Sequence, residues 1–322
     1  MSNYPKTVKM VAMSETLKKK TAILLATYNG ERYLQRQLDS LFTQTDRDWI
    51  VYAHDDGSTD GTKKILSDRH EKYPDDLKII DGEPTGSACA NFFYLMRNVE
   101  AEYFFFCDQD DIWEENKIEL FRREMSRTES GNSAKPCMVF SDVSLINENG
   151  RQIAERMSVY QSLDMSRYGF NNLMLQNIVT GCAMMANRAL VERALECKEP
   201  GRIIMHDYWM ALVAAYFGRI ACLDAATVRY RRHKDNTIGA ERELSISYIR
   251  GKLGSARRSL CQRQEQMRVF VETFGLSEEK DPAACMCAHL FDMPKAKRLS
   301  FYSKYDVGKS GIIRRLGLLL CG

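Results

Sequence analysis

The chain has 322 residues, of which 44% are hydrophobic and 10% aromatic, and 46 basic against 43 acidic residues leave a formal net charge of +3. This is enough apolar mass for a substantial core in one large domain or one and a half. The basic residues cluster only in the C-terminal tail, which argues against a nucleic-acid partner.

Neither end of the chain predicts export or membrane insertion. No apolar stretch of signal-peptide length follows the basic residues Lys18 to Lys20, and no uninterrupted apolar run approaches a length of about 20 residues. The ten cysteines are scattered, without a C-x-x-C pair or the Cys/His spacing of a zinc site. We therefore predict free, mostly buried thiols in a cytoplasmic protein.

Short apolar runs alternate with helical spacings through the first third of the chain. Residues 1–20 are polar and lack periodicity, so we expect a flexible lead-in. The predicted strands are 22–26, 49–53, 77–80 and 103–107, and helical patterns lie at 34–42, around 65–66 with an end near Pro74, and at 92–99. Strands that alternate with helices predict right-handed βαβ units and a Rossmann-like α/β fold, with a mostly parallel sheet flanked by helices.

The second half has a less regular pattern. We predict a strand at 137–141, a hairpin within 143–153 that turns at Asn149-Gly150, and an irregular segment at 155–176 that covers a site. Residues 181–186 are small and apolar, Asp207 opens a helix, and a strand at 227–231 leads into His233. From residue 246 onward the chain reads as helical.

Polar groups follow three of the predicted strands, where ligands of such sheets bind. They form the segments Thr27–Gly30, His54–Ser58 and Asp108–Asp111. Two carboxylates at the spacing of Asp108 and Asp110 can face one hard cation, Mg²⁺ or Mn²⁺, which keeps open positions for diphosphate oxygens. The alternative is that Asp108 caps the helix that follows.

Calcium loops of the EF-hand type do not explain the acidic clusters. The loop that begins at Asp56 would close at Ser67, where a glutamate is needed, and the loop from Asp108 has Ile112 and Trp113 at ligand and glycine positions. For residues 55–61 two interpretations stay open. Either Gly57 makes a strand-to-helix turn capped by Ser58 or Thr59, or the two aspartates bind a base or ribose.

Six motifs in order over residues 20–240 make the sequence resemble the family 2 glycosyltransferases. They are LLATYNGERYLQRQLDSLFTQT, DDGSTDGT, FFFCDQDDIW, TGCAMMANRAL, HDYWMALVAAYFG and YRRHKDNTIG. The resemblance implies a GT-A fold and inversion at the sugar carbon. DQDDIW, HDYW and the late R-x-H-x-x-N are most similar to a bacterial rhamnosyltransferase-like branch that builds surface polysaccharides.

The resemblance also implies roles for residues of the nucleotide side. The donor nucleotide is expected to contact Thr27, Tyr28, Asn29, Glu31, Asp55, Asp56 and Asp108. Asp110 is expected to hold the metal, with His233 as the late metal or pyrophosphate ligand. Asp111 either binds the sugar or caps the next helix. Arg231 and Arg232 are expected to meet the diphosphate, because guanidinium pairs well with phosphate.

On the acceptor side Asp207 matches the position of the catalytic base, which takes the proton of the acceptor hydroxyl. A helix N-terminus lowers the basicity of a carboxylate, so a low-dielectric pocket has to act the other way. The alternative is an ordinary N-cap.

His206 stands where many members have Glu, and its role is open. Gly181 and Cys182 match the stretch lining the acceptor side, and Trp209 either stacks on a sugar or packs in the core.

The expected organisation is a lead at 1–20, a GT-A domain at 21–240 with halves 21–112 and 113–240, and a helical basic region at 241–322. We expect a nucleotide diphosphate sugar as donor, dTDP-rhamnose first and a UDP-hexose second, and a lipid-linked or oligosaccharide acceptor. The rivals are a sugar nucleotidyltransferase, whose glycine-rich phosphate loop is missing after the first strand, and an inactive nucleotide-sugar-binding partner.

The basic C-terminal region has two interpretations. Ile246, Ile249, Leu253, Ala256 and Leu260 recur at helical spacing among arginines and lysines. Such a helix either lies on an anionic membrane surface, which would place the protein at the inner face of the plasma membrane, or packs on the catalytic domain with a solvated face.

Overall fold

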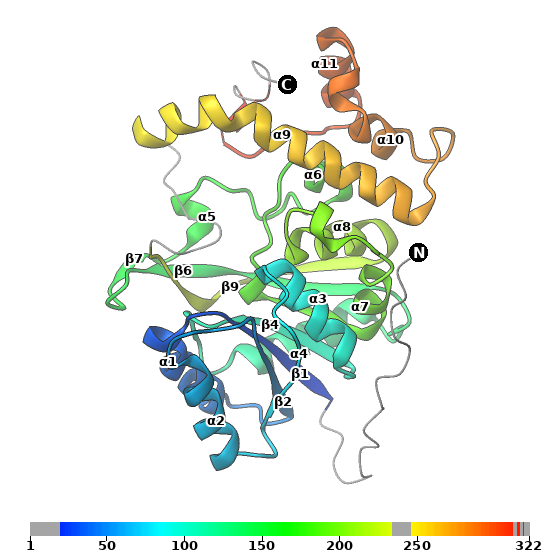
Figure 1. Ribbon diagram of the computed structural model, residues 1–322. Helices are drawn as coiled ribbons and strands as arrows, with labels where there is room; N and C mark the ends of the chain where they lie inside the picture. The colour runs from blue at the N-terminus through cyan, green and yellow to red at the C-terminus, as the bar shows by residue number, and fades with distance from the viewer. Residues whose placement is uncertain (1–19, 234–245, 312–313, 316–317, 319–322) are drawn as a thin grey trace.

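The computed structural model describes residues 20–233, 246–311, 314, 315 and 318, so the expected lead at 1–20 lies almost wholly outside the described residues. The first third alternates strands and helices as predicted (Figure 1). The strands are β1 (Thr21–Thr27), β2 (Trp49–Asp55), β3 (Leu77–Ile79) and β4 (Tyr103–Asp108), and the helices are α1 (Glu31–Phe42), α2 (Thr62–Lys72) and α3 (Ala88–Asn98).

β1 lies at the centre of this part of the sheet, parallel to β2 on one side and β4 on the other. All seven of its residues are buried, which is why its sequence is a continuous apolar run rather than an alternating one. Ala22, Leu24 and Ala26 enter one hydrophobic core, whereas Ile23 and Leu25 enter the core on the other face. The carboxyl ends of β1, β2 and β4 therefore reach the same edge of the sheet.

The second half adds strands of both directions. Its elements are β5 (Ile112–Trp113), α4 (Lys117–Glu129), β6 (Cys137–Ile146), β7 (Gln152–Ala154), α5 (Met157–Tyr160), α6 (Phe170–Leu173), η1 (Gly181–Ala183), β8 (Met184–Asn187), α7 (Arg188–Ala194), η2 (Pro200–Arg202), α8 (His206–Phe217) and β9 (Arg219–Arg231). The sheet order is β3-β2-β1-β4-β8-β6-β9-β5, with β7 beside β6. Pairing is parallel from β3 to β4, whereas β8 runs antiparallel to both β4 and β6. The predominance of parallel pairs thus holds for the first half, and beyond β4 the sheet is mixed.

The predicted hairpin is present between β6 and β7, with Ile146 opposite Gln152. Gly150 has a φ of 82° in the turn, a conformation that glycine adopts without a steric cost.

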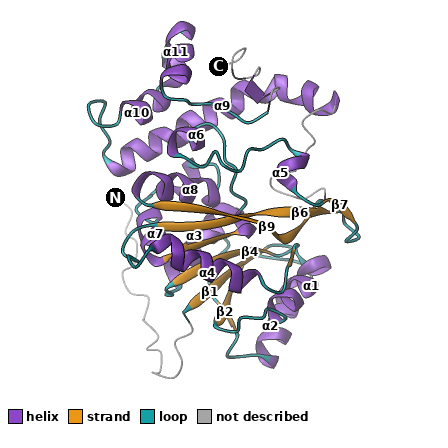
Figure 2. Ribbon diagram, turned by 180° about the vertical axis from the view of Figure 1, so that it is seen from behind, coloured by secondary structure: helices purple, strands orange, loops and turns teal. Residues whose placement is uncertain are grey.

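Helices cover both faces of the sheet (Figure 2). α1 and α4 contribute Leu34, Leu38, Ile118 and Phe121 to one core, and α3, α7 and α8 contribute to the other. The described cysteines are free, and most of them are buried.

The C-terminal region is helical, as predicted, with α9 (Ile246–Phe274), α10 (Pro282–Ala288), η3 (Leu290–Asp292) and α11 (Lys295–Lys304). α9 crosses above α8 and α6 in Figure 1, and Phe270 and Phe274 of α9 pack against the ring of Trp209. The described part of α9 thus packs on the sheet domain. The side chains of 246–256, which carry most of the predicted apolar stripe, lie outside the described residues. In the described part of the chain no helix is long and apolar enough to cross a membrane.

Candidate active site

The loops after β1 and β2 are held together by their own polar side chains. Asp55 accepts hydrogen bonds from the backbone N–H of Ser58 at 2.8 Å and from the hydroxyls of Ser58 and Thr27 at 2.5 and 3.0 Å. Asp56 accepts from the Thr85 hydroxyl at 2.8 Å and from the Gly86 N–H at 3.1 Å. These carboxylates therefore shape the edge of the sheet at which the donor nucleotide was predicted.

The expected capping of α2 by Ser58 or Thr59 is wrong, because α2 begins at Thr62 and its N-cap is Gly61. Thr59 instead donates its N–H to Asn29 at 2.9 Å. Gly57 does adopt the predicted unusual conformation, with a φ of 88°. Glu31, at the start of α1, accepts the N–H of Gly61 at 2.9 Å and so links the first two loops.

Tyr28 is exposed, with 58% of its surface accessible. Its backbone N–H and C=O bond to the side-chain amide of Gln109, both at 2.8 Å. Gln109 is the middle residue of the Asp108–Asp110 motif, and no sequence pattern singles it out. It ties the first loop to the acidic loop, so that both loops keep one relative position.

Asp108, Asp110 and Asp111 converge after β4. Burial raises the pKa of Asp108 to about 7, and the negative charges of Asp110 and Asp207 act in the same direction. Asp111 is buried, and its Oδ1 accepts the backbone N–H of Arg231 at 2.9 Å, while its Oδ2 has no hydrogen-bond partner among the described residues. Neither Asp108 nor Asp111 caps α4, which begins at Lys117 with Asn116 as its N-cap, so the capping alternative is wrong.

Asp110 and His233, the two residues predicted as metal ligands, are in direct contact. His233 Nε2 lies 2.6 Å from Asp110 Oδ2, and the imidazole ring stacks on Tyr33 with centroids 5.2 Å apart. These two residues are 123 positions apart in the chain and are joined by the pairing of β5 with β9. Asn236, the last residue of the motif that includes His233, lies outside the described residues.

Arg231 has a different place from the predicted one. It is fully buried, and its guanidinium donates to the carbonyls of Asp110 at 2.7 Å and of Asn147 and Glu148 at 3.2 and 3.1 Å. This corrects the predicted diphosphate contact, because the guanidinium is enclosed and bonded to the acidic loop itself. Arg232 is half-buried and meets the hydroxyl of Tyr160 at 3.4 Å.

Lys117, the first residue of α4, is a neighbour of the candidate site that the sequence interpretation missed. Its side chain is fully buried, its ammonium donates a hydrogen bond to the carbonyl of Cys182, and it stands 3.3 Å from the centroid of the Trp113 ring. Burial lowers the pKa of Lys117 to about 7, against the opposing effect of Asp111 and Asp108. A lysine at the first position of a helix is unfavourable, because a positive charge there opposes the helix dipole. This pattern could have drawn attention to Lys117 from the sequence.

Cys182 links the acidic loop to the predicted acceptor side. A ligating atom from each of Asp108, Asp111 and Cys182 lies within 4.8 Å of the others. The preceding residue, Gly181, has little room for a side chain, because a Cβ there would lie 3.0 Å from His206 Nε2. The small residues of the η1 turn thus let α8 approach the end of β4.

Asp207 is the second residue of α8 and is only 7% exposed. Burial raises the pKa of its carboxyl to about 7, while hydrogen bonds from the Tyr208 and Gly181 N–H groups and from Asn177 oppose this rise. The helix N-cap is Met205, so the alternative of an ordinary N-cap at Asp207 is wrong. Its charge also acts on Asp108, which brings the two halves of the predicted site together electrostatically.

His206 is buried against Phe92 and Phe106, with ring centroids 4.0 and 5.2 Å away. Burial lowers the pKa of its imidazole to about 3, so the ring is neutral beside Asp207. Trp209 is also fully buried, and its indole N–H bonds to the carbonyl of Ala194 at 3.0 Å. Of the two alternatives for Trp209, the structure therefore supports packing in the core.

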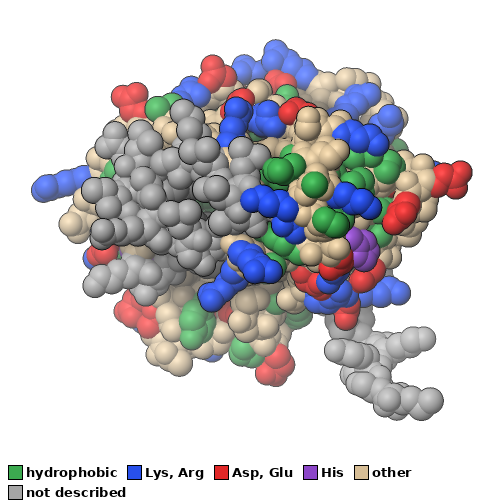
Figure 3. Space-filling model, turned by 90° about the horizontal axis from the view of Figure 1, so that it is seen from above, with side chains coloured by type: hydrophobic (Ala, Val, Ile, Leu, Met, Phe, Trp, Pro, Cys, Tyr) green, Lys and Arg blue, Asp and Glu red, His purple; other side chains and the backbone are tan. Residues whose placement is uncertain are grey.

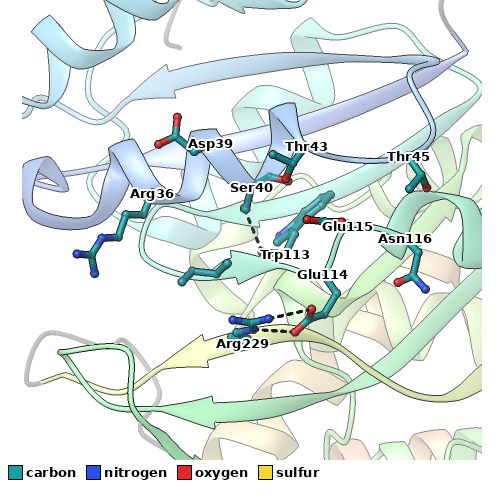
Figure 4. Close-up of a pocket in the computed structure, with 11 residues that line it drawn as sticks. Arg36, Asp39, Ser40, Thr43, Thr45, Trp113, Glu114, Glu115, Asn116 and Arg229 are labelled. Atoms are coloured by element: carbon teal, nitrogen blue, oxygen red, sulfur yellow. Dashed lines mark hydrogen bonds and ion pairs between the residues drawn. The ribbon is translucent and has the colours of Figure 1, made fainter.

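A pocket is lined by residues of α1, among them Arg36, Asp39 and Ser40 (Figure 4). It lies between α1 and the segment from Ile112 to Asn116, and Arg229 closes it by pairing with both carboxylate oxygens of Glu114, at 2.8 and 3.2 Å. None of the predicted site residues lines it.

The comparisons with known proteins agree with this geometry. A family model described as Glycosyl transferase family 2 matches residues 22–195, which is more than half of the chain. The chain belongs to glycosyl transferase family 2. It is therefore a glycosyltransferase, and the resemblance drawn from the six motifs is confirmed.

Curated relatives include bacterial members of this family. The chain is 28% identical over 246 residues to dTDP-rhamnosyl transferase RfbG of Shigella flexneri, covering 70% of this chain and 77% of that one. It is 24% identical over 161 residues to the putative teichuronic acid biosynthesis glycosyltransferase TuaG of Bacillus subtilis, covering 50% and 59%. An uncharacterized glycosyltransferase of Nostoc, alr2836, is 24% identical over 222 residues, covering 67% and 66%. The match thus spans less than two thirds of the last two relatives.

Solved structures share the fold. The structure of S. aureus TarS 1–349 in complex with UDP matches with a TM-score of 0.54 at 16% identity, covering 89% of this chain and 90% of that one. Mannosyltransferase PcManGT from Pyrobaculum calidifontis, in complex with GDP-Man and Mn²⁺, matches with a TM-score of 0.53 at 16% identity, covering 92% and 77%. The GT-A fold is thereby shown for this chain.

Proposed function

We propose that this family 2 glycosyltransferase inverts the sugar carbon in a single displacement, with Asp207 as the base. The observation that carries the proposal is the buried carboxyl at the start of α8, whose pKa is raised to about 7. A base with a pKa near the working pH is well matched to remove a proton from a hydroxyl as its oxygen attacks. Low-dielectric surroundings, to which the neutral ring of His206 contributes, raise the pKa of Asp207, whereas the dipole of α8 lowers it.

Asp110 and His233 would hold a divalent cation, with Asp108 and Asp111 beside them. The kinds of donor support this assignment, because the carboxylate of Asp110 lies beside the imidazole of His233, and a carboxylate oxygen of Asp111 lies within 4.8 Å of one from Asp108. Carboxylate oxygens suit Mg²⁺ or Mn²⁺, and PcManGT was solved with Mn²⁺. When bound, such an ion neutralises charge that develops on a leaving diphosphate.

The chain's own residues have separate tasks in this proposal. The exposed ring of Tyr28 and the loops shaped by Asp55 and Asp56 bind the base and ribose, with Thr27, Asn29 and Glu31 alongside. Arg232 is left as the arginine that meets the diphosphate, since Arg231 is enclosed. Gly181, Cys182 and His206 line the acceptor side next to Asp207.

We propose dTDP-rhamnose as the first donor to test and a UDP-hexose as the second. The similarity to a dTDP-rhamnosyl transferase supports the first, and the UDP complex of TarS supports a uridine donor on the same fold. The acceptor in this proposal is a growing glycan on a lipid carrier in bacterial surface polysaccharide synthesis. The similarity to TuaG, which is named for teichuronic acid biosynthesis, supports a role in glycan synthesis.

A lipid-linked acceptor would place the protein at a membrane surface. α11 exposes Lys295, Lys297, Leu299 and Lys304, and basic side chains are spread over this end of the molecule with acidic ones among them (Figure 3). We propose peripheral contact through this basic C-terminal region. Failure of the full chain to bind anionic vesicles at low salt contradicts this part of the proposal and leaves the transfer chemistry untouched.

The experiment that tests the donor site is calorimetric titration of dTDP, UDP and GDP, each with and without Mn²⁺. We expect one pyrimidine diphosphate to bind, and to bind more tightly with the metal. The Asp207→Asn variant is the matched control. It lacks the proposed base and is expected to bind the same nucleoside diphosphate as the wild type. If folded protein binds none of the three, the chain is a degenerate member with a scaffolding role.

A further inference from the structure

The start of α8, which carries Asp207, is not held by a cap of its own. Its N-cap is Met205, whose side chain makes no capping hydrogen bond. Met205 and Ile203, the residue after η2, both have extended backbone conformations. The backbone N–H groups of such a segment need partners on other elements, because no helix or turn of their own supplies them.

Gln266 of α9 is one such partner. Its Oε1 accepts the backbone N–H of Ile204 at 2.9 Å, just before α8 begins. Gln266, Phe270 and Phe274 follow at a spacing of four and so share one face of α9, which lies above α8 in Figure 1. The two phenylalanines pack against the ring of Trp209, whereas Gln266 is only 1% exposed. A buried amide is unfavourable unless it is hydrogen-bonded, so the bond to Ile204 explains a glutamine on this face.

Arg202 ties the same segment to α9 from its more exposed side. The guanidinium of Arg202, at the end of η2, donates to Glu265 at 2.8 and 2.9 Å and to Glu272 at 2.9 Å, and both acids belong to α9. It also donates to Glu199 at 2.7 Å. A single exposed ion pair contributes little to stability, but several carboxylates around one guanidinium restrict where it can lie.

We propose that Gln266 is a positioning residue for sugar transfer. Through the N–H of Ile204 it fixes the start of α8, and with it the place of the Asp207 carboxyl. The inference rests on the proposed function, in which Asp207 is the base. A base has to lie within hydrogen-bonding reach of the acceptor hydroxyl, so a displacement of about 1 Å slows transfer while donor binding is kept.

The first test compares Gln266→Met with Gln264→Met in the full chain by hydrogen exchange. Both glutamines are buried in α9, and Gln264 accepts the N–H of Phe291 at 2.7 Å, in η3. We expect exchange to be about fivefold faster over 203–206 in Gln266→Met, and around Phe291 in Gln264→Met. Exchange at the wild-type rate over 203–206 in Gln266→Met would overturn the inference.

Turnover separates a positioning role from a general loss of stability. It is measured as dTDP or UDP released from dTDP-rhamnose or UDP-glucose in the presence of Mn²⁺, with water as the acceptor. We expect Gln266→Met to lower kcat about tenfold with the KM for the donor unchanged, whereas Gln264→Met keeps both values. Gln266→Glu retains an oxygen that accepts the N–H of Ile204 and should recover most of the rate.

The double variant Asp207→Asn/Gln266→Met tests whether Gln266 acts through the base. Without the base there is no proton acceptor to misplace, so Gln266→Met should lower kcat no further in the Asp207→Asn protein. A further loss there, or an equal loss of kcat in the two glutamine variants, overturns the role of Gln266 alone. Turnover by Asp207→Asn at the wild-type rate overturns the proposed base and this inference with it.

Arg202→Met takes the place of Gln266→Met if that variant does not fold. It releases the same segment by removing the contacts with Glu265 and Glu272, which lie at the surface. We expect faster exchange over 203–206 and a kcat about threefold lower, again at unchanged KM for the donor. Wild-type exchange and kcat in Arg202→Met would contradict the proposal that α9 holds the start of α8.

Discussion

The two halves of the candidate site use their carboxylates in opposite ways. In the nucleotide half, Asp55 is surrounded by donors, with the Ser58 N–H and the hydroxyls of Ser58 and Thr27 all within 3.0 Å. In the acceptor half, Asp207 is 7% exposed, and burial outweighs its hydrogen bonds and raises its pKa to about 7. Hydrogen bonds to a carboxylate favour its charged form, whereas burial disfavours it.

The hydrogen-bonded carboxylates of the nucleotide half are suited to binding a ligand, whereas the buried carboxyl of Asp207 is suited to proton transfer. Loops fixed by their own side chains present a constant shape to a ligand, and a buried acid with a raised pKa is ready to exchange a proton near neutral pH. The acidic loop of Asp108 to Asp111 shares features of both, because it is hydrogen-bonded to Arg231 and its Asp111 is buried.

The largest effect is expected from removing the base. Asp207→Asn should fold and bind the donor nucleotide, yet lower kcat by roughly 10³-fold, within the range that a general base contributes. The wild-type rate should rise with pH through about 7, because the carboxyl has to lose its proton before it can accept another. The variant's residual rate should lack this rise.

Transfer assays over a pH series, with Asp224→Asn as control, check this prediction. The side chain of Asp224 is 93% exposed, so its amide should leave the pH profile as it is. Turnover by Asp207→Asn near the wild-type rate would remove Asp207 as the base and abolish the contrast between the halves.

An intermediate effect is expected at the acidic loop, on stability. Arg231→Met removes a buried guanidinium from the carbonyls of Asp110, Asn147 and Glu148, and should lower the free energy of unfolding by about 3 kcal/mol. The neighbouring Arg232→Met loses one long contact and should change it by less than about 0.5 kcal/mol. Urea unfolding of both variants gives the comparison, and equal losses would contradict the positioning role of Arg231.

The smallest effect is expected at the η1 turn. Gly181→Ala places a Cβ 3.0 Å from His206 Nε2, so the buried ring and Asp207 must shift by a few tenths of an ångström. We expect kcat to fall by about tenfold, since catalytic groups tolerate little displacement, with a loss of about 1 kcal/mol in stability. Gly201→Ala, where no atom lies within 4 Å of the added Cβ, is the control. An unchanged kcat in Gly181→Ala would show that Asp207 tolerates displacement.

Much of the fold and part of the site follow from local sequence pattern. Three features were predictable: the apolar run at β1, the alternation of strands and helices through β4, and the turn at Gly150. Burial patterns and φ restrictions act on residues that are close in the sequence. The meeting of Asp110 with His233 was predicted through family motifs, although nothing local joins positions so far apart. The division into domains and the donor sugar stay predictions.

Tertiary structure alone decided what the buried polar residues contact. The sequence determined an α/β chain with carboxylates after its strands and a helix that begins near Asp207. Only the fold enclosed Arg231 and Trp209, turned β8 antiparallel to β4, and brought Lys117 to the carbonyl of Cys182. The physical reason is that hydrophobic periodicity reports which face of an element is buried, whereas the partner of a buried charge comes from a distant segment that the periodicity does not identify.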